Sequence, residues 1–398
     1  MFDTIYIGTS GLLNNAKGLR VVGNNLANVN TPGFKSSQLQ FASLFEQNGG
    51  SPAQSDASGN QAHSGAGMTV AGTQINFRAG LEQGTGNPLD LAVNGNGFYV
   101  VKRGDDLLYT REGDFQFDAK NVLVNSSGDH VQGFDNGVLS DITLDKLERS
   151  APKATSSVTL RGELSLTAAS STTPVVDQTL SGVTVLDANG VDHPVSLSFH
   201  HDGNGSFTVT VKDSANAVVK TGTIKFAAGA AVAGSDSLTF SYTPPGGSAT
   251  PLKLDFSKLT SVAASTAPIA MDSQDGYEAG VKTDQTFDDK GVLNVQYSNG
   301  QKATGPRIAL ADFVTGSALQ EAGGSAFRKA DGAKVFYGNA GTSSFGTIAS
   351  GKREGSNVDL AEEFGNLILM QRGYQAASHV VSTANDMIQQ LFDMKGNR

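Results

Sequence analysis

The chain contains no cysteine and no tryptophan, and only 17% of its 398 residues are charged. Without cysteine, neither a disulfide framework nor a thiolate metal site can form. The formal net charge is -9, so the chain lacks the basic surface that nucleic-acid binding requires. No apolar run reaches the length of a membrane span, and the N-terminal residues lack the basic stretch and apolar core of a signal peptide. These absences predict no nucleic-acid partner and no membrane insertion, for a protein that is either cytosolic or exported without a cleaved signal peptide.

The patterns that mark catalysis and cofactor binding are also missing. The histidines are scattered along the chain, at His63, His130, His193, His200, His201 and His379. His200 and His201 would point to opposite faces of a strand, so they are badly placed to share one metal ion. The chain has no phosphate-binding glycine loop with its lysine, and no Gly-x-Ser-x-Gly turn. The sequence therefore predicts a protein that is not an enzyme and uses no cofactor.

Apolar residues repeat every seven positions near both ends of the chain. The columns of the two repeats are Ile5, Leu12, Leu19, Val22 and Leu26 at the N-terminus, and Leu360, Leu367, Met370, Tyr374, Val381, Ile388 and Leu391 at the C-terminus. Such a repeat is typical of helices that pack along a narrow seam. Either pattern alone fits an ordinary amphipathic surface helix. Two matched seams at opposite ends predict that the first and last segments pair as a coiled coil, and that these residues form the assembly seam.

Local signals place the ends of these two helices. Pro32-Gly33 is a turn signal that stops the N-terminal helix. Ser356 or Asn357 is expected to cap the first turn of the C-terminal helix. Asp359 follows within that first turn, where the helix dipole favours an anion.

The segment after the N-terminal helix changes from connector to β-structure. Residues 46–67 have hardly an apolar side chain, which predicts a flexible connector over residues 41–70. Residues 89–93 and 98–101 flank Asn94-Gly95-Asn96-Gly97 and predict a hairpin. The phrase at residues 117–123 recurs at 287–293, where each copy fits two strands joined by a tight turn, and neither has the acidic run of a calcium loop. This recurrence suggests that segments before and after the middle of the chain share one domain.

Between residues 150 and 280, short runs of Thr, Ser, Val and Ala alternate with turn signals, which predicts an inserted β-barrel or sandwich. The predicted fold is therefore mainly β with long terminal α-helices and with discontinuous, nested domains. Residues 1–40 and 355–398 form a terminal helical assembly domain, and residues 41–70 form the connector. Residues 71–149 and 281–354 form the first β-domain, and residues 150–280 form an inserted outer β-domain.

Several phrases of this sequence resemble those of the bacterial flagellar rod and hook family. The residues that match the two terminal signatures are Asn25, Ala27, Asn28, Thr31, Gly33, Phe34 and Lys35, and then Ser356, Asn357, Val358, Asp359, Gln371, Arg372 and Tyr374. Residues 89–98 and 109–115 resemble motifs of the first β-domain in that family. The chain departs from the family pattern at Arg353-Glu354-Gly355, because Leu-Glu usually stands just before the Ser-Asn-Val phrase.

The resemblance implies a structural subunit that polymerises head to tail into a curved hollow tube, with the terminal helices as its inner wall. In this family such a tube is the flexible joint that transmits motor torque from the rod to the filament. The implied partners are other copies of the chain, the distal rod protein, the hook cap, the hook-filament junction proteins and the flagellar export apparatus. The implied location is extracellular, on the flagellum at the basal body. Two alternatives are a distal rod subunit with an inserted domain and a secreted β-domain adhesin.

Overall fold

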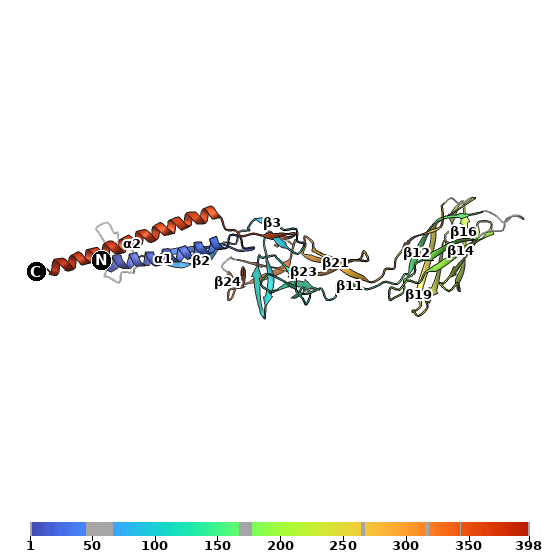
Figure 1. The fold of residues 1–398 in the computed structure, drawn as a ribbon, viewed down its shortest axis with the longest axis horizontal. Helices are drawn as coiled ribbons and strands as arrows, with labels where there is room; N and C mark the ends of the chain where they lie inside the picture. Colours follow the sequence, from blue (N-terminus) through green and yellow to red (C-terminus); the bar gives the residue numbers. More distant parts are fainter. Residues whose placement is uncertain are drawn as a thin grey trace. The chain divides into compact units, whose positions relative to one another are not determined.

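The structure is a computed structural model that describes residues 2–44, 67–166, 177–263, 267–314, 318–342 and 344–396. The chain divides into two compact units. Unit 1 comprises residues 1–145, 285–294 and 304–398, and unit 2 comprises residues 146–284 and 295–303. Both units are rich in β-strands, and the two helices lie at the N- and C-terminal ends of the chain, as the composition and the heptad patterns predict (Figure 1).

The two helices of unit 1 pack against each other. Helix α1 spans Phe2–Ala27 and helix α2 spans Leu360–Gly396. Gly8 lies against Val381 and Gly18 lies against Met370, so residue numbers fall along one helix as they rise along the other and the pair is antiparallel. Among the described residues, neither helix is long and apolar enough to cross a membrane.

The cap of α2 differs from the one that the sequence predicts. Oδ1 of Asp359 accepts hydrogen bonds from the backbone N–H groups of Ala361 and Glu362, at 2.8 and 3.2 Å. Asp359 is therefore the N-cap, and the prediction of Ser356 or Asn357 is wrong. The side chain of Asn357 makes its hydrogen bonds outside the helix, to the backbone N–H group of Ser36 and the carbonyl oxygen of Asn76.

A two-stranded antiparallel ribbon packs along α1. It consists of β1, Ser37–Ser43, and β2, Met68–Ile75. Nδ2 of Asn14 on α1 donates to the carbonyl oxygen of Met68 at 2.5 Å, which fixes one end of the ribbon to the helix. The two ends of the predicted connector are therefore paired strands, because residues 41–43 and 68–70 satisfy each other's backbone groups. Residues 45–66 lie outside the described residues.

The remaining strands of unit 1 build a mixed set of antiparallel pairs. They are β3 Glu82–Gly84, β4 Leu91–Asn94, β5 Phe98–Arg103, β6 Asp106–Thr110, β7 Gln116–Phe117, β8 Leu123–Val124, β9 His130–Asp135, β10 Val138–Asp141, β24 Leu319–Gly323, β25 Ala326–Lys329, β26 Val335–Asn339, β27 Thr347–Ser350 and β28 Lys352–Glu354. Three further strands hold residues of both units: β21 Gly280–Phe287, β22 Val292–Tyr297 and β23 Lys302–Phe313. The core of unit 1 includes the buried Phe98, Val100 and Tyr109.

The predicted hairpin at residues 89–101 does not form. Strand β4 pairs with β27, and β5 pairs with β6, β9 and β23. Gly95 and Gly97 both have positive φ, at 108° and 123°, which is accessible to glycine. The glycines reverse the chain as expected, but the partner of each strand is chosen by packing against segments that are distant in sequence.

Unit 2 is built on a nine-stranded sheet around a single apolar core. Its strands are β12 Ser157–Ser165, β13 Gln178–Val183, β14 Val195–Gly203, β15 Ser206–Lys212, β16 Val218–Ala227, β17 Ala230–Ala231, β18 Ser237–Tyr242, β19 Thr250–Val262 and β20 Ala270–Gln274, and the short β11 Arg149–Ser150 pairs with β21. Most neighbouring strands are antiparallel, whereas β12 and β19 run parallel. Inward-facing side chains such as Leu197, Val209 and Phe256 are buried.

One turn accounts for the repeated phrase in the sequence. A side-chain oxygen accepts hydrogen bonds from the N–H groups two and four residues later, and the residue three positions later has positive φ. This turn begins at Asp118, Asn125, Asp187, Asp213 and Asp288. Asn or Gly occupies the positive-φ position in each case, as these residues tolerate it best. Because copies occur in both units, the repeat reflects local turn chemistry and does not by itself assign two segments to one domain.

Candidate assembly site

The contact between α1 and α2 is made by small residues. A Cβ atom on Gly8 would lie 2.6 Å from Cγ2 of Val381, and one on Gly11 would lie 3.2 Å from Cβ of Ala377. On α2, a Cβ atom on Gly373 would lie 2.6 Å from Oδ1 of Asn15. Glycine at these positions lets one helix backbone approach side chains of the other closely. The packing of the two helices thus depends on glycines, which have no side chain, as much as on apolar side chains.

The predicted seam residues occupy several environments. Val22 is buried; Ile5, Leu12, Leu19, Leu26, Leu367, Met370, Val381 and Ile388 are partly buried; and Leu360, Tyr374 and Leu391 are exposed. Exposed apolar side chains on a helix form a surface that another chain can bury, and such burial is favourable. The role of these residues in assembly stays a prediction.

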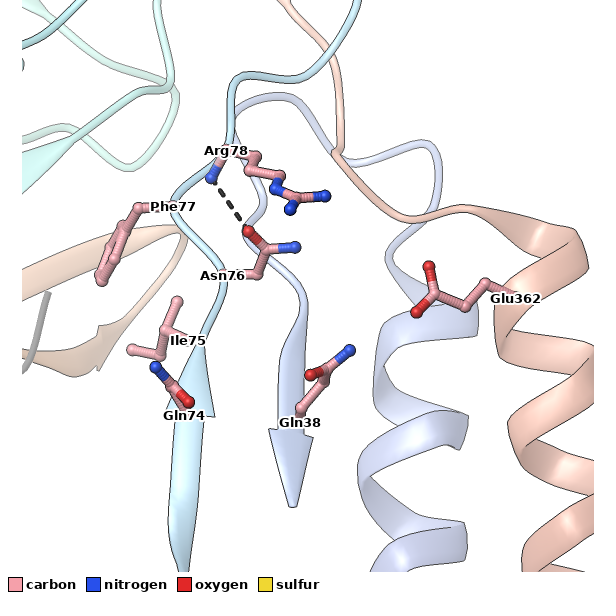
Figure 2. Close-up of a pocket in the computed structure, with 7 residues that line it drawn as sticks. All are labelled: Gln38, Gln74, Ile75, Asn76, Phe77, Arg78 and Glu362. Atoms are coloured by element: carbon pink, nitrogen blue, oxygen red, sulfur yellow. Dashed lines mark hydrogen bonds between the residues drawn. The ribbon is translucent and has the colours of Figure 1, made fainter. Parts of the chain in front are cut away.

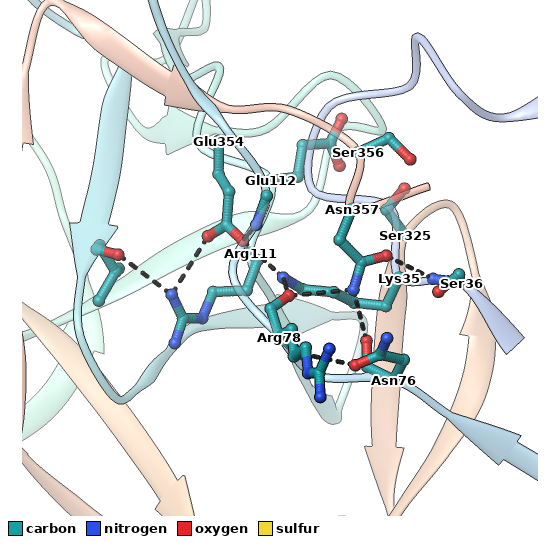
Figure 3. A network of polar contacts seen from close by, with 12 residues as sticks. Lys35, Ser36, Asn76, Arg78, Arg111, Glu112, Ser325, Glu354, Ser356 and Asn357 are labelled. Atoms are coloured by element: carbon teal, nitrogen blue, oxygen red, sulfur yellow. Dashed lines mark hydrogen bonds and ion pairs between the residues drawn. The ribbon is translucent and has the colours of Figure 1, made fainter. Parts of the chain in front are cut away.

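Three segments that are distant in sequence meet in a buried ionic network at the base of the helical pair. Nζ of Lys35 donates to Oε1 of Glu354 at 2.5 Å, and Nη1 of Arg111 donates to Oε2 of the same carboxylate at 3.1 Å. All three side chains are at least 93% buried. Figure 3 shows the carboxylate of Glu354 between the two cations. We call Lys35, Arg111 and Glu354 the junction triad.

Backbone groups add further hydrogen bonds to the triad, although Nε of Arg111 has no hydrogen-bond partner among the described residues. Nζ of Lys35 also donates to the carbonyl oxygen of Arg78 at 2.7 Å, and Arg111 donates to the carbonyl oxygens of Val93 and Gly95. The Glu354 carboxylate accepts a further bond from the N–H group of Gly80 at 2.9 Å. Buried charges are tolerated when they are paired and hydrogen-bonded in this way. The triad therefore joins the chain after α1, the chain after β2, the β-strands and the chain before α2.

Burial governs the protonation of the lysine in this triad. It lowers the pKa of the Lys35 ammonium, while the adjacent Glu354 carboxylate opposes the shift and Arg111 adds to it. The Arg111 guanidinium also lies 5.2 Å from the centre of the Phe98 ring, a distance at which a cation is attracted to an aromatic face. Arginine cannot lose its proton in a protein, so Arg111 requires the Glu354 carboxylate more strictly than Lys35 does.

A tight turn seats the end of α1 on the β-strands. Gly33 has a φ of 66°, and a Cβ atom there would lie 2.4 Å from the backbone nitrogen of Glu112. Its N–H group donates to the carbonyl oxygen of Glu354 at 2.9 Å. Asn357 binds the same turn from the other side, since its Oδ1 accepts from the N–H group of Ser36 at 2.8 Å. The two terminal segments are therefore tied to each other beside the triad.

A second polar contact links the two helices. Nδ2 of the buried Asn25 donates to Oε1 of Glu363 at 2.7 Å and to the carbonyl oxygen of Ser37 at 2.8 Å. Oδ1 of Asn25 accepts from the N–H group of Ser37. Asn25 thus contacts α2 and the ribbon at once. Burial raises the pKa of Glu363, and the hydrogen bond from Asn25 opposes that shift.

The signature residues fall into three groups. Asn25, Gly33, Phe34, Lys35 and Asn357 gather around the junction, where the N–H group of Asn357 donates to the carbonyl oxygen of Phe34 at 3.3 Å. Asn28 and Thr31 shape the turn after α1, Ala27 ends α1, Ser356 and Val358 precede α2, and Asp359 caps α2. Gln371, Arg372 and Tyr374 are exposed further along α2.

Sequence reasoning missed Arg111 and Glu354 as site residues. Arg111 lies in the family-like motif at residues 109–115, and Glu354 lies in Arg353-Glu354-Gly355, where the chain departs from the family pattern. The charge of Lys35 was the one available signal for an acidic partner. Lys35 lies in a turn rich in residues that pack closely, and a buried cation needs an anion. Nothing in the sequence, however, indicates which of the carboxylates is that anion.

A groove of about 540 Å³ lies beside the junction, between the ribbon and the start of α2. Figure 2 shows its lining: Gln38, Gln74, Ile75, Asn76, Phe77, Arg78 and Glu362. The lining is mainly polar, which suits hydrogen bonds with water or with another chain. In the described parts of the chain, no group of three His, Cys, Asp or Glu residues is placed to hold a metal ion.

Two carboxyl groups follow Arg111 closely in the sequence: Glu112, which is buried, and Asp114, which is partly buried. Oε1 of Glu112 accepts from the hydroxyl of Ser126 at 2.5 Å, whereas Oε2 of Glu112 and Oδ1 of Asp114 have no hydrogen-bond donor among the described residues. Burial raises the pKa of Glu112 to about 7, the bond from Ser126 lowers it, and the nearby Asp114 carboxylate raises it. Burial also raises the pKa of Asp114. Glu112 is therefore partly protonated at neutral pH.

The Glu112→Gln variant is expected to lose part of the pH dependence of stability. The ordinary pKa of 4.5 applies to Glu112 in the unfolded chain and a pKa of about 7 to Glu112 in the folded one, so the contribution of Glu112 to stability is greatest below pH 4.5 and is lost as the pH rises through 7. We expect the fall in unfolding free energy between pH 5 and pH 8 to be about 2 kcal/mol smaller in the variant. Urea denaturation followed by circular dichroism measures it. Glu362→Gln, at an exposed position on α2, is the control, and an unchanged pH profile in Glu112→Gln would contradict the assignment.

Comparison with known proteins finds three family models along the chain. Residues 5–35 match "Flagella basal body rod protein", residues 92–166 match "Flagellar hook protein FlgE/F/G D1 domain", and residues 349–394 match "Flagellar basal body rod FlgEFG protein C-terminal". Each of the three matched segments contributes one member of the junction triad. The segments that carry the family likeness are thus the segments that meet in space at this site.

The chain is also similar to complete relatives over nearly its whole length. The flagellar hook protein FlgE of Escherichia coli (strain K12) is 29% identical over 409 residues, covering 97% of this chain and 98% of the relative. FlgE of Borreliella burgdorferi is 29% identical over 446 residues, covering 99% and 100%. Among solved structures, the Helicobacter pylori flagellar hook protein FlgE2 aligns with a TM-score of 0.45 and 11% identity, covering 67% of this chain and 98% of that one.

Proposed function

We infer that this chain, which belongs to the bacterial flagellar rod and hook family, is a structural subunit of the flagellar hook. The observation that carries the inference is the meeting of all three family-matched segments in one buried junction at the base of the paired helices. The relatives that match the chain from end to end are named as hook proteins, which favours a hook subunit over a distal rod subunit with an inserted domain.

The proposed mechanism is polymerisation and not catalysis. Copies of the chain add head to tail through unlike surfaces, and contacts of that kind produce an open helical filament. The terminal helices, with their exposed apolar side chains, form the inner wall of a curved hollow tube. The polar β-strand surfaces lie outside and slide past one another as the tube bends. The tube thereby transmits motor torque to the filament as a flexible joint.

We propose a nested domain arrangement for this subunit. The helical assembly domain comprises residues 1–40 and 355–398, the first β-domain residues 71–149 and 281–354, and the outer β-domain residues 150–280, with the connector at 41–70. The division into two compact units supports this arrangement. The helices pair as a coiled coil through the heptad seam, an assignment that the antiparallel contact of α1 and α2 supports.

The proposed location is outside the cell, on the flagellum at the basal body. The chain reaches it through the flagellar export apparatus without a cleaved signal peptide. Its neighbours there are other copies of itself, the distal rod protein, the hook cap and the hook-filament junction proteins. These partners follow from the family and from the names of the relatives.

Electron microscopy of the purified chain under polymerising conditions tests this function. We expect curved tubes from the full chain and folded monomers from a chain that lacks residues 1–40 and 355–398. Leu367→Asp places a carboxylate in the partly buried face of α2 and is also expected to remain monomeric, because burying a charge without a partner is costly. Circular dichroism of the monomers checks that the β-strands remain folded. Equal polymers from the full and truncated chains would refute the role of the terminal helices.

A further inference from the structure

Helix α2 is longer than α1, and the last turns of α2 have no partner among the described residues. Gly8 lies against Val381, and α1 begins six residues before Gly8. Because the helices are antiparallel, the N-terminus of α1 lies opposite about Met387 of α2. Helix α2 continues to Gly396, past the N-terminus of α1 (Figure 1). The overhang carries Leu391, Phe392 and Met394, which are 50 to 74% exposed. We call these three residues the tip patch.

A second apolar patch lies at the other end of the same helix. Leu360, Phe364 and Ile368 follow one another at intervals of four, so they form one stripe on α2, and they are 45 to 51% exposed. Glu363 and Met370, which contact α1, lie on a different side of the helix. We call Leu360, Phe364 and Ile368 the base patch. It faces away from α1 and is not covered by the described residues.

We propose that the tip patch of one copy of the chain docks on the base patch of the next copy. This inference rests on the proposed function, and it names the two surfaces that join consecutive subunits. The patches are different surfaces on one molecule, so their contact is heterologous and can repeat without closing a dimer. Burial of apolar side chains on both sides supplies the free energy of the contact.

The position of the tip patch determines what covers it. Ile388, Leu391 and Phe392 continue, beyond the N-terminus of α1, the side of α2 that Ala377, Val381 and Ala384 present to α1. The segment that covers the tip patch therefore lies where α1 would lie if it were longer, and it extends the contact between α1 and α2. In the proposed assembly, the first turns of α2 from the next copy occupy this place.

The base patch is about as long as the overhang that carries the tip patch. At 1.5 Å per residue, the base patch extends about 12 Å along α2, and the overhang from Met387 to Met394 extends about 10 Å. Phe364 and Leu391 are 27 positions apart, so alignment of the patches shifts consecutive copies by about 40 Å along the helix axis. The same overlap leaves the contact between α1 and α2 intact within each copy. The contact therefore fixes a repeat distance as well as a surface.

Cysteine cross-linking tests the contact with no background, since the chain has no cysteine of its own. The variant Phe364→Cys/Leu391→Cys carries both halves, and its two cysteines are about 40 Å apart on one helix, too far for a disulfide within one chain. Oxidised tubes are expected to give a ladder of covalent multimers on a denaturing gel, and reduction returns the ladder to monomer. A ladder forms only if each copy is joined to one neighbour through position 391 and to another neighbour through position 364. Dimers alone would indicate a symmetric contact and overturn the proposal.

The matched control is Gln371→Cys/Leu391→Cys. Gln371 is exposed and lies two turns along the same stripe, about 10 Å from Phe364. We expect at least tenfold less cross-linked product from this pair than from the first. Equal products from both pairs, or tubes of the first variant without a ladder, would overturn the docking proposal while the proposed function stands.

The unaltered chain gives an independent measurement. Electron microscopy of its tubes is expected to show copies related by a shift of about 40 Å along the direction of α2. A shift greater than about 55 Å, the length of α2, would exclude overlap of tip and base and so overturn the contact without any variant. If the unaltered chain forms no tubes with its hook cap present, the proposed function itself fails. The two failures are thus distinguished.

Discussion

Glu354→Leu is expected to lower the free energy of unfolding of unit 1 by about 3 to 5 kcal/mol, because it leaves two buried cations without their anion. Lys35 can meet part of this loss by releasing its proton, since burial already lowers the pKa of its ammonium group. Arg111 cannot do so. The variant also removes the acceptor for the N–H group of Gly80. Chemical denaturation at pH 7, followed by circular dichroism, measures the change.

Glu82→Leu is the control for this experiment. Glu82 pairs with Lys352 at 3.0 Å at the surface, and exposed pairs of this kind contribute at most about 1 kcal/mol. The triple variant Lys35→Met/Arg111→Met/Glu354→Leu removes all three charges and is expected to recover most of the loss, since apolar replacement of a buried ionic group is often neutral. A Glu354→Leu variant as stable as Glu82→Leu would show that the triad does not hold the junction together.

Gly8→Leu/Gly11→Leu is expected to force the two helices apart and to weaken assembly. A Cβ atom on Gly8 would lie 2.6 Å from Cγ2 of Val381, and one on Gly11 would lie 3.2 Å from Cβ of Ala377. Overpacking of this kind costs about 1 to 3 kcal/mol at each site. Because 1.4 kcal/mol corresponds to a factor of ten, we expect the protein concentration needed for assembly to rise at least tenfold, as measured by sedimentation of polymer.

The control changes two glycines of the same helices that contact nothing. A Cβ atom at Gly23 or Gly365 would meet no other atom within 4 Å. Gly23→Leu/Gly365→Leu therefore gains helix propensity, about 1 kcal/mol at each site, without a clash. Its monomers are expected to be more helical and to keep the two helices together. If the Gly8 and Gly11 variant assembled as readily as the unaltered chain, close approach of the helices would be unnecessary for the tube.

The helices were the part of the fold most open to prediction. Their seven-residue repeats and the proline-free C-terminal segment predict two long helices that pack together in a mainly β chain, and the structure confirms that pairing. The contact residues were less predictable. The heptad reading draws attention to large apolar side chains, whereas Gly8, Gly11 and Gly373 let the helices approach. A pattern of apolar residues indicates which large side chains pack together, and it does not indicate where a glycine is needed for the helices to approach.

The errors share one physical origin, which is competition from distant segments. Asn357 is a good capping residue by itself, but its side chain bonds to Ser36 and Asn76, so Asp359 takes the cap. The glycines at 95 and 97 reverse the chain, yet β4 pairs with β27. Glu354 could not be identified as a site residue for the same reason. Local propensity describes what a segment can do, and tertiary contacts decide which option is used.

The order in which the junction triad is made has a consequence for the newly synthesised chain. Glu354 follows Lys35 by 319 residues and Arg111 by 243. The ribosome therefore synthesises Lys35 and Arg111 long before Glu354. Until Glu354 is present, the two cations are more stable in water than buried without an anion. The closure of so long a loop also delays the contact. The junction can therefore close only after the chain has been made as far as Glu354, and a product that stops earlier lacks the shared anion of the triad.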